Sequence, residues 1–103
     1  MTKLLTAVQL EKQKKSLDGA WRVLRNGTVL SRTIKTADFL SAYTLLTTIT
    51  VQAELAQHHP DIEISYGRLK VNLTSHEQGG LTRKDIQLAS AIDSICRRAG
   101  ITE

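Results

Sequence analysis

The sequence predicts an α+β fold with the element order α-β-β-α-β-β-α, in which a four-stranded antiparallel sheet has its helices packed on one face. An Asn-Gly pair and a Tyr-Gly-Arg triplet each separate two stretches of alternating apolar and polar residues, which is typical of β-hairpins. A long segment without glycine or proline joins the two hairpins and carries apolar residues at helical spacing. With 103 residues, the chain is expected to form one domain, residues 1–103, around a single two-layer core.

The first expected element is a short helix that begins after Thr6 and ends at Gly19. Thr6, followed three residues later by Gln9, is a capping-box pattern, and Leu5 and Leu10 flank it as a hydrophobic staple. Glycine adopts the left-handed backbone of a C′ position at little cost, so Gly19 is well placed to end the helix. The apolar positions that alternate with the lysines of this segment are Ala7, Leu10 and Leu17.

A β-hairpin is expected next, from residues 20–25 and 28–35 on either side of Asn26-Gly27. This dipeptide best accommodates the positive φ angles of a type I′ turn. The flanking segments alternate with a period of two residues, as strands with one wet face do. The positions that carry this alternation are Trp21, Val23, Leu30, Arg32 and Ile34.

One long helix is expected over residues 36 to about 57, because apolar residues recur there at three- and four-residue steps. The β-branched run at residues 47–51 favours a strand on propensity alone, but the length of the segment and its sustained stripe favour a helix. Pro60 lacks a backbone N–H and restricts the residue before it, so the helix should stop near His58 and leave His59 extended. The stripe consists of Phe39, Ala42, Leu46, Ile49 and Ala53.

The second hairpin is expected to turn at Tyr66-Gly67-Arg68, and a loop over residues 77–80 follows it. Its two strands again alternate with a period of two residues. The apolar positions are Ile62, Ile64 and Tyr66 before the turn, and Leu69, Val71 and Leu73 after it.

The last helix is expected to begin with a second capping box, formed by Thr82 and Asp85, and to end at Gly100. Because Cys96 is the only cysteine, it cannot form an internal disulfide, and a small buried thiol is expected. The apolar stripe of this helix is Ile86, Ala89, Ile92 and Cys96.

The charge balance raises the question of nucleic-acid binding, since the net charge is +4 and the pI is near 9.5. Basic residues are spread through every segment, and the four aromatic residues do not interleave with them, so no stacking platform is expected. A solvated surface is the favoured interpretation, although its positive field can attract an anionic or electron-rich ligand. No apolar run approaches the ~20 residues of a membrane span, and no signal peptide is evident. A cytoplasmic location is therefore expected, with neither nucleic acid nor membrane as a partner.

The candidate site lies at the end of the long helix, where His58 and His59 precede Pro60. The third histidine, His76, follows the second hairpin, close enough for the fold to bring all three imidazoles to one mouth. Imidazole can both donate and accept a proton near neutral pH, so the site suits acid–base chemistry. The alternative is that His58 and His59 only complement the dipole at a helix C-terminus.

The spacing Glu54-x3-His58-His59-Pro60-x5-Tyr66-x9-His76-x8-Asp85 resembles the signature of the pterin-4a-carbinolamine dehydratase family. The sequence departs from the family pattern at Ile62, where an aromatic residue is common, and at Lys84, where an arginine is common; residues 33–35 also lack the usual aromatic residues. Further similarities cover most of the chain, at Trp21, Leu30, Arg32, Phe39, Gly80-Leu81-Thr82, Leu88-Ala89 and Ile92-Asp93.

The resemblance implies that 4a-hydroxytetrahydropterin loses water to give quinonoid dihydropterin, a step of tetrahydrobiopterin recycling, with no metal and no organic cofactor. One imidazole would protonate the leaving oxygen and another would take the proton of N5. The residues implied as catalytic are His58, His59 and His76. Those implied as substrate-binding are Glu54, Pro60, Asp61, Tyr66 and Asp85.

Other roles remain open for three of the substrate-binding residues. Glu54 could orient an imidazole, hold pterin N–H groups or be a surface carboxylate. Asp85 could orient His76, but its capping-box role is sufficient by itself and is favoured. Tyr66 is more readily explained as a half-buried strand aromatic than as a ligand contact.

Two other functions compete with this interpretation. Three histidines and a water can bind zinc, but adjacent histidines rarely chelate one ion and no fourth ligand is evident. Some relatives act as dimerisation cofactors of a transcription factor, which suggests a non-catalytic interaction module. A homodimer or homotetramer is expected in any case, because a sheet of this size leaves one face and its edges uncovered.

Overall fold

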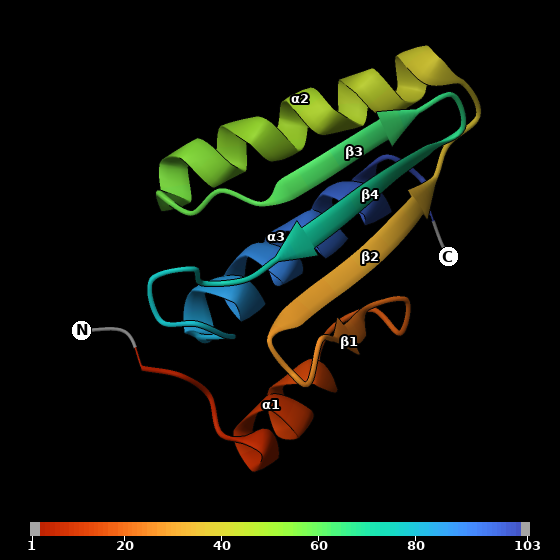
Figure 1. Cartoon of the computed structure of the whole chain (residues 1–103). Coiled ribbons are helices and arrows are strands. Elements are labelled where there is room, and N and C mark those ends of the chain that lie inside the picture. Colours follow the sequence, from red (N-terminus) through yellow and green to blue (C-terminus); the bar gives the residue numbers. More distant parts are fainter. Residues whose placement is uncertain (1–2, 102–103) are drawn as a thin grey trace.

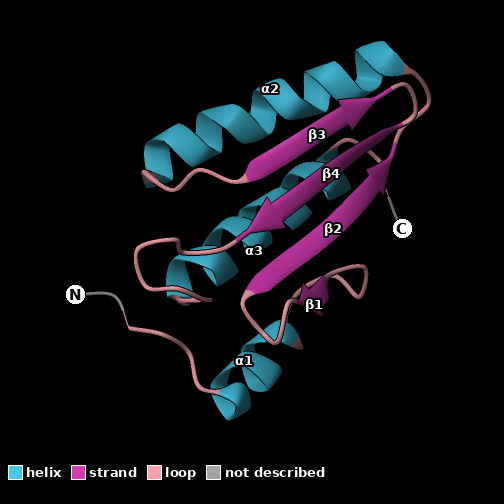
Figure 2. Ribbon diagram, viewed as in Figure 1, coloured by secondary structure: helices cyan, strands magenta, loops and turns pink. Residues whose placement is uncertain are grey.

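The computed structural model describes residues 3–101, and it confirms the predicted fold class (Figure 1). Three helices and four strands follow one another in the predicted order, and the two long helices pack on one face of the sheet (Figure 2). The elements are α1 (Ala7–Lys14), β1 (Arg22–Leu24), β2 (Val29–Lys35), α2 (Phe39–Ala56), β3 (Asp61–Ser65), β4 (Arg68–Leu73) and α3 (Arg83–Arg98).

The sheet is antiparallel throughout, with the strand order β1-β2-β4-β3. Val71 of β4 lies at its centre, because it pairs with Arg32 of β2 on one side and with Ile62 of β3 on the other. Alternate strand residues face the helices and form one core with them. The fully buried members of this core include Leu30, Ile34, Leu69, Val71, Leu73, Ile49, Ala89 and Ile92.

Helix α1 is shorter than expected, and the prediction that Gly19 ends it is wrong. The capping box of Thr6 and Gln9 is present, but the helix stops at Lys14, and none of its residues is buried. Leu17 is buried beyond the helix end, in a turn that its N–H forms with the Lys14 carbonyl. The helix therefore ends early because Leu17 packs into the core.

The first hairpin turns where the sequence predicted. Asn26 and Gly27 have φ angles of 57° and 84°, as in a type I′ turn, and the N–H of Thr28 donates to the Arg25 carbonyl at 3.3 Å. Arg25 also has a positive φ, of 52°, and Leu24 pairs with Val29, so the loop spans residues 25–28 and is longer than the two residues expected. Strand β1 is shorter than expected. Arg32, although charged, is only 1% exposed and lies on the buried side of β2.

Helix α2 forms despite its β-branched run, and it begins later than expected because Asp38 caps it by accepting a hydrogen bond from the Ser41 N–H. Several threonine hydroxyls donate to the carbonyl four residues earlier, which satisfies them within the helix. The predicted stripe needs one correction. Phe39 is 49% exposed, and Leu45 lies in the core instead.

The second hairpin and α3 agree with the prediction except at Tyr66, which was expected to be a half-buried strand residue. Tyr66 lies in the turn after β3 and is 71% exposed. The capping box of Thr82 and Asp85 is present, and Gly100 follows α3 with a φ of 79°. Cys96 is buried, and this burial raises the pKa of its thiol. Among residues 3–101, no helix has the length and apolar character needed to span a membrane.

Candidate active site

All three histidines line one pocket of about 500 Å³ at one end of the sheet. Strand register explains the convergence, because Asp61 at the start of β3 pairs with Asn72 near the end of β4. The segment before β3 carries His58 and His59, and the loop after β4 carries His76, so both meet at this edge. The lining residues are Gln57, His58, His59, Thr74, Ser75, His76, Glu77, Gln78 and Lys84. The geometry expected from the sequence is present, whereas the catalytic roles of the histidines stay predictions.

The end of α2 fixes the position of His58. The helix closes at Gln57, which adopts a left-handed backbone with a φ of 53°, and the N–H of His58 donates to the Ala53 carbonyl at 3.1 Å. These contacts turn the chain sharply toward α3. The His58 side chain is consequently only 12% exposed.

Asp85 forms the capping box that the sequence favoured, and the imidazole it contacts is that of His58, whereas the less favoured alternative was a contact with His76. The Nε2 atom of His58 lies 2.6 Å from Oδ1 of Asp85, which is fully buried. The other oxygen, Oδ2, accepts hydrogen bonds from the Thr82 N–H and the Ser75 hydroxyl, each at 2.8 Å. A carboxylate in its ionised form can only accept, so with Asp85 in that form Nε2 of His58 is the donor and Nδ1 remains for a ligand. Asp85 therefore caps α3 and orients an imidazole at the same time.

The other two histidines have exposed carboxylate partners. His59 Nε2 lies 2.7 Å from Oε2 of Glu54, and both side chains are more than half exposed. His76 Nε2 lies 3.8 Å from Oδ2 of Asp61, and both side chains are 73% exposed. Each imidazole thus faces its own acid. The site combines one buried His–Asp pair with two imidazoles that solvent or a ligand can reach.

Tyr66 does not join this pocket within one chain. Ser65 pairs with Arg68 at the far end of the second hairpin, so Tyr66 lies a whole strand away from Asp61. Figure 1 shows the turn between β3 and β4 at that end. A contact of Tyr66 with the substrate stays a prediction. Pro60 lies between His59 and Asp61 and supplies the chain break that separates α2 from β3.

Two hydroxyl groups at the site were missed as functional residues in the sequence. Ser75 is 4% exposed and Thr82 is fully buried, and their side-chain oxygens lie 2.8 Å apart beside Asp85. An isolated serine before a histidine gives no recognisable signal. Thr82 was identified as a helix cap, but only the tertiary contact with Ser75 links it to His58.

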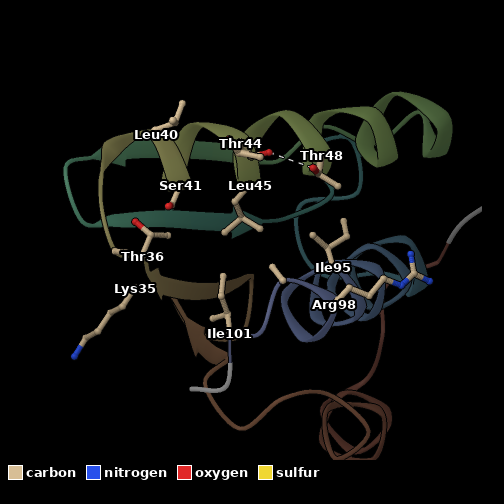
Figure 3. Close-up of a pocket in the computed structure, with 12 residues that line it drawn as sticks. Lys35, Thr36, Leu40, Ser41, Thr44, Leu45, Thr48, Ile95, Arg98 and Ile101 are labelled. Carbon is tan, nitrogen blue, oxygen red and sulfur yellow. Dashed lines mark hydrogen bonds between the residues drawn. The ribbon is translucent and has the colours of Figure 1, made fainter.

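A larger hollow, of about 660 Å³, lies at the opposite end of the sheet (Figure 3). Its walls carry apolar side chains of Leu45, Ile95 and Ile101, and its ionisable lining residues are Lys35 and Arg98. Among residues 3–101, no histidine or carboxylate lines it, so these residues offer no acid–base pair there near neutral pH. The smaller histidine pocket is therefore the better candidate active site. Among the described residues, no group of three His, Cys, Asp or Glu side chains is close enough to hold a metal ion.

The fold and the pocket together define an α+β protein with acid–base groups at one edge of an antiparallel sheet. The sequence matches the family model described as Pterin 4 alpha carbinolamine dehydratase over residues 3–95. The chain belongs to this family.

Relatives and solved structures agree with the assignment. A protein from a Nostoc species, provisionally named a pterin-4-alpha-carbinolamine dehydratase, is 43% identical over 92% of this chain and 99% of its own length. A protein of the same provisional name from Chloroflexus aggregans is 47% identical over 70% of this chain and 77% of its own length.

A crystal structure described as a transcriptional coactivator/pterin dehydratase from Brucella melitensis superposes with a TM-score of 0.85 at 27% identity, over 90% of this chain and 98% of that one. A pterin dehydratase-like protein identified as a RuBisCO assembly factor in the alpha-carboxysome shares the fold. Its TM-score is 0.63 at 16% identity, over 74% of this chain and 88% of that one.

Proposed function

We propose that residues 1–103 form a single domain that dehydrates 4a-hydroxytetrahydropterin to quinonoid dihydropterin. The observation that carries this proposal is the pocket lined by three imidazoles, one of which is held by a buried carboxylate. Membership of the family supports the same reaction.

The reaction requires two proton transfers at neighbouring atoms. The C4a–O bond breaks as an acid protonates the departing hydroxyl, and a base removes the proton of N5 as the N5=C4a double bond forms. Imidazoles can serve in either role near neutral pH, each contributing roughly 10²–10⁴-fold. His58, His59 and His76 supply both roles, and no step needs a metal or an organic cofactor. Glu54 and Asp61 would accept hydrogen bonds from ring N–H groups of the pterin, since their carboxylates are exposed beside the pocket.

Direct assay of the dehydration tests the proposal. Purified protein added to 4a-hydroxytetrahydropterin should accelerate the loss of water above the no-enzyme rate, and treatment with a chelator should leave the rate unchanged. Metal analysis of the same sample tests the zinc alternative, which requires bound zinc in the active protein. A preparation that is folded but does not exceed the no-enzyme rate would remove the proposal.

Replacement of Asp85 by asparagine is expected to impair both folding stability and the histidine pair. One oxygen and one NH₂ group cannot accept the three hydrogen bonds that the carboxylate accepts, so a buried donor loses its partner, at a cost of about 1–3 kcal/mol, unless the imidazole changes its tautomer. If the NH₂ group faces His58, Nε2 must accept and the imidazole proton moves to Nδ1. Nitrogen NMR of the imidazole should detect this change of tautomer, alongside a lower rate of dehydration. An unchanged tautomer with full activity would limit Asp85 to its capping role.

The chain is expected to be a homodimer or homotetramer, because α2 has a second apolar face that residues 3–101 leave exposed. Helical periodicity places this face opposite the buried positions of α2. Its exposed residues are Leu40, Tyr43, Val51 and Leu55. A second copy of the chain is the proposed occupant. The outer edge of β3 is likewise unpaired within residues 3–101, and a neighbouring copy could cover it.

Light scattering coupled to size exclusion measures the oligomeric state. Val51→Lys with Leu55→Lys should dissociate an assembly that uses this face, while Arg22→Glu on the opposite edge strand serves as the control. A strict monomer at micromolar concentration would contradict the prediction.

The same apolar face favours a second candidate function, a non-catalytic interaction module. The Brucella relative described as a transcriptional coactivator/pterin dehydratase supports such a dual role. A triple His58→Ala, His59→Ala, His76→Ala variant that keeps its oligomeric state and its biological effect in cells would support the module. Loss of that effect together with turnover would support the enzyme.

A further inference from the structure

A basic hollow adjoins the histidine pocket and shares one residue, Lys84, with it. The hollow measures about 660 Å³. Three of its lining side chains are cations, Lys3, Arg83 and Lys84, and no carboxylate lines it. Its other lining residues are Leu4, Leu5, Thr6, Gln9 and Gln87. We call it the outer basic pocket.

The fold builds this hollow by fixing the N-terminal segment against the start of α3 (Figure 1). Leu4 pairs with Thr82 in an isolated antiparallel bridge, and the Leu5 N–H donates to the Leu81 carbonyl at 2.8 Å. A Cβ atom at Gly80 would lie 2.9 Å from the Leu4 side chain, so the contact is close. Lys3 is thereby held on the same side as Arg83 and Lys84.

These cations lack ion-pair partners within the part of the chain that the structure describes. The ion pairs found among residues 3–101 involve Arg32 and the three histidines, and none involves Lys3, Arg83 or Lys84. All three cationic side chains are exposed. Carboxylates instead surround the histidine pocket, where Glu77 is a lining residue and Glu54 and Asp61 face imidazoles. An anionic group on a bound ligand would therefore be repelled from the acidic surroundings of the histidines and attracted toward Lys84.

The chemistry of the proposed substrate connects the two pockets. In a 6-substituted tetrahydropterin, the side chain is attached at C6, which is bonded directly to N5, one of the two reacting atoms. A ring whose N5 and C4a lie among the histidines must therefore start its side chain inside the same pocket. Lys84 lines both hollows, so a side chain that passes it enters the outer basic pocket.

We infer that the outer basic pocket is a subsite for a phosphate ester on the C6 side chain of the pterin, which Lys84, Arg83 and Lys3 contact. This inference rests on the proposed function and narrows its substrate class to pterins with an anionic side chain. Lysine ammonium groups and an arginine guanidinium are suitable partners for phosphate.

Binding of two probes tests the subsite, dihydroneopterin and dihydroneopterin monophosphate, which differ only in the phosphate. Pterin fluorescence reports their affinity without turnover. Exposed ion pairs each contribute a few-fold, so the ester should bind about tenfold more tightly than the neutral pterin, and added salt should reduce the difference. Lys3→Gln with Arg83→Gln should lower this preference to about twofold or less and leave the affinity for neutral dihydroneopterin unchanged.

The matched control is Lys35→Gln with Arg98→Gln, which removes the same charge at the opposite end of the sheet (Figure 3). Equal affinities of the wild-type protein for both probes would overturn the subsite and leave the dehydratase proposal intact. An equal loss in the control variant would also overturn it, because a general positive field would then explain the preference. Inorganic phosphate that displaces the ester at the ester's own concentration would indicate a site for free phosphate instead. Failure of both probes to bind would remove the proposed function, and the subsite with it.

Discussion

Replacing His58 by alanine is expected to lower the rate of 4a-carbinolamine dehydration by roughly 10²–10⁴-fold, down to the no-enzyme rate where that sets the floor. His58 is the imidazole whose orientation is fixed, since Asp85 holds its Nε2 atom at 2.6 Å. Single His59→Ala and His76→Ala variants should also be slower, because the proposed acid and base both come from this trio.

The melting temperatures of these histidine variants distinguish a loss of catalysis from a loss of folded protein. His59 and His76 are more than half exposed, so their replacement should leave the melting temperature nearly unchanged. His58→Ala leaves the buried Asp85 without one hydrogen bond, and His58→Gln, which can restore a donor, is the matched variant. Three single alanine variants that all retain full activity would contradict the proposed chemistry.

Replacing Asp93 by alanine is expected to destabilise the protein by about 3–5 kcal/mol, because the buried guanidinium of Arg32 loses its hydrogen-bonded carboxylate and keeps only Asp18, whose Oδ2 lies 3.7 Å from Nη2. Oδ1 of Asp93 accepts from Arg32 Nη1 at 2.6 Å and from Trp21 Nε1 at 2.8 Å, and Oδ2 accepts from the Asp18 N–H at 2.8 Å. Arg32 already has two buried nitrogens, Nε and Nη2, without a hydrogen-bond partner. The loss is a large share of the 5–15 kcal/mol by which small domains are stable.

Urea denaturation followed by the fluorescence of Trp21, the single tryptophan, measures this effect. Asp38→Ala is the control, since it removes an exposed helix cap and should lower the stability much less than Asp93→Ala does. Combining Asp93→Ala with Arg32→Met should recover part of the loss, because the unpaired charge disappears. If Asp93→Ala lowers the free energy of unfolding by less than about 1 kcal/mol, the charge of Arg32 does not depend on Asp93 for its stabilisation, and the prediction is wrong.

Signals that act within a few residues were sufficient to predict most of the fold. The capping boxes at Thr6 and Thr82 and the turn at Asn26-Gly27 all formed, because each depends on hydrogen bonds or φ preferences between near neighbours in the chain. The spacing around Pro60 likewise indicated where α2 would end and where two of the histidines would lie.

Long-range packing decided the features that the sequence predicted wrongly. Helix α1 ends early because Leu17 is buried against elements far along the chain, and Leu45 replaces Phe39 in the core because α3 and the sheet determine which side of α2 is covered. Tyr66 is exposed because the strand ends one residue before it.

The site shows the same division between local and tertiary information. Sequence spacing identified the three histidines and Asp85, and the register of β3 with β4 brought the histidines to one pocket. The pairing of Asp85 with His58, supported by Ser75, depends on how α3 docks beside the end of α2, 27 residues away in the chain. No local sequence pattern predicts this contact. The burial that strengthens the hydrogen bond between Asp85 and His58 exists only once the helices and the sheet have packed together.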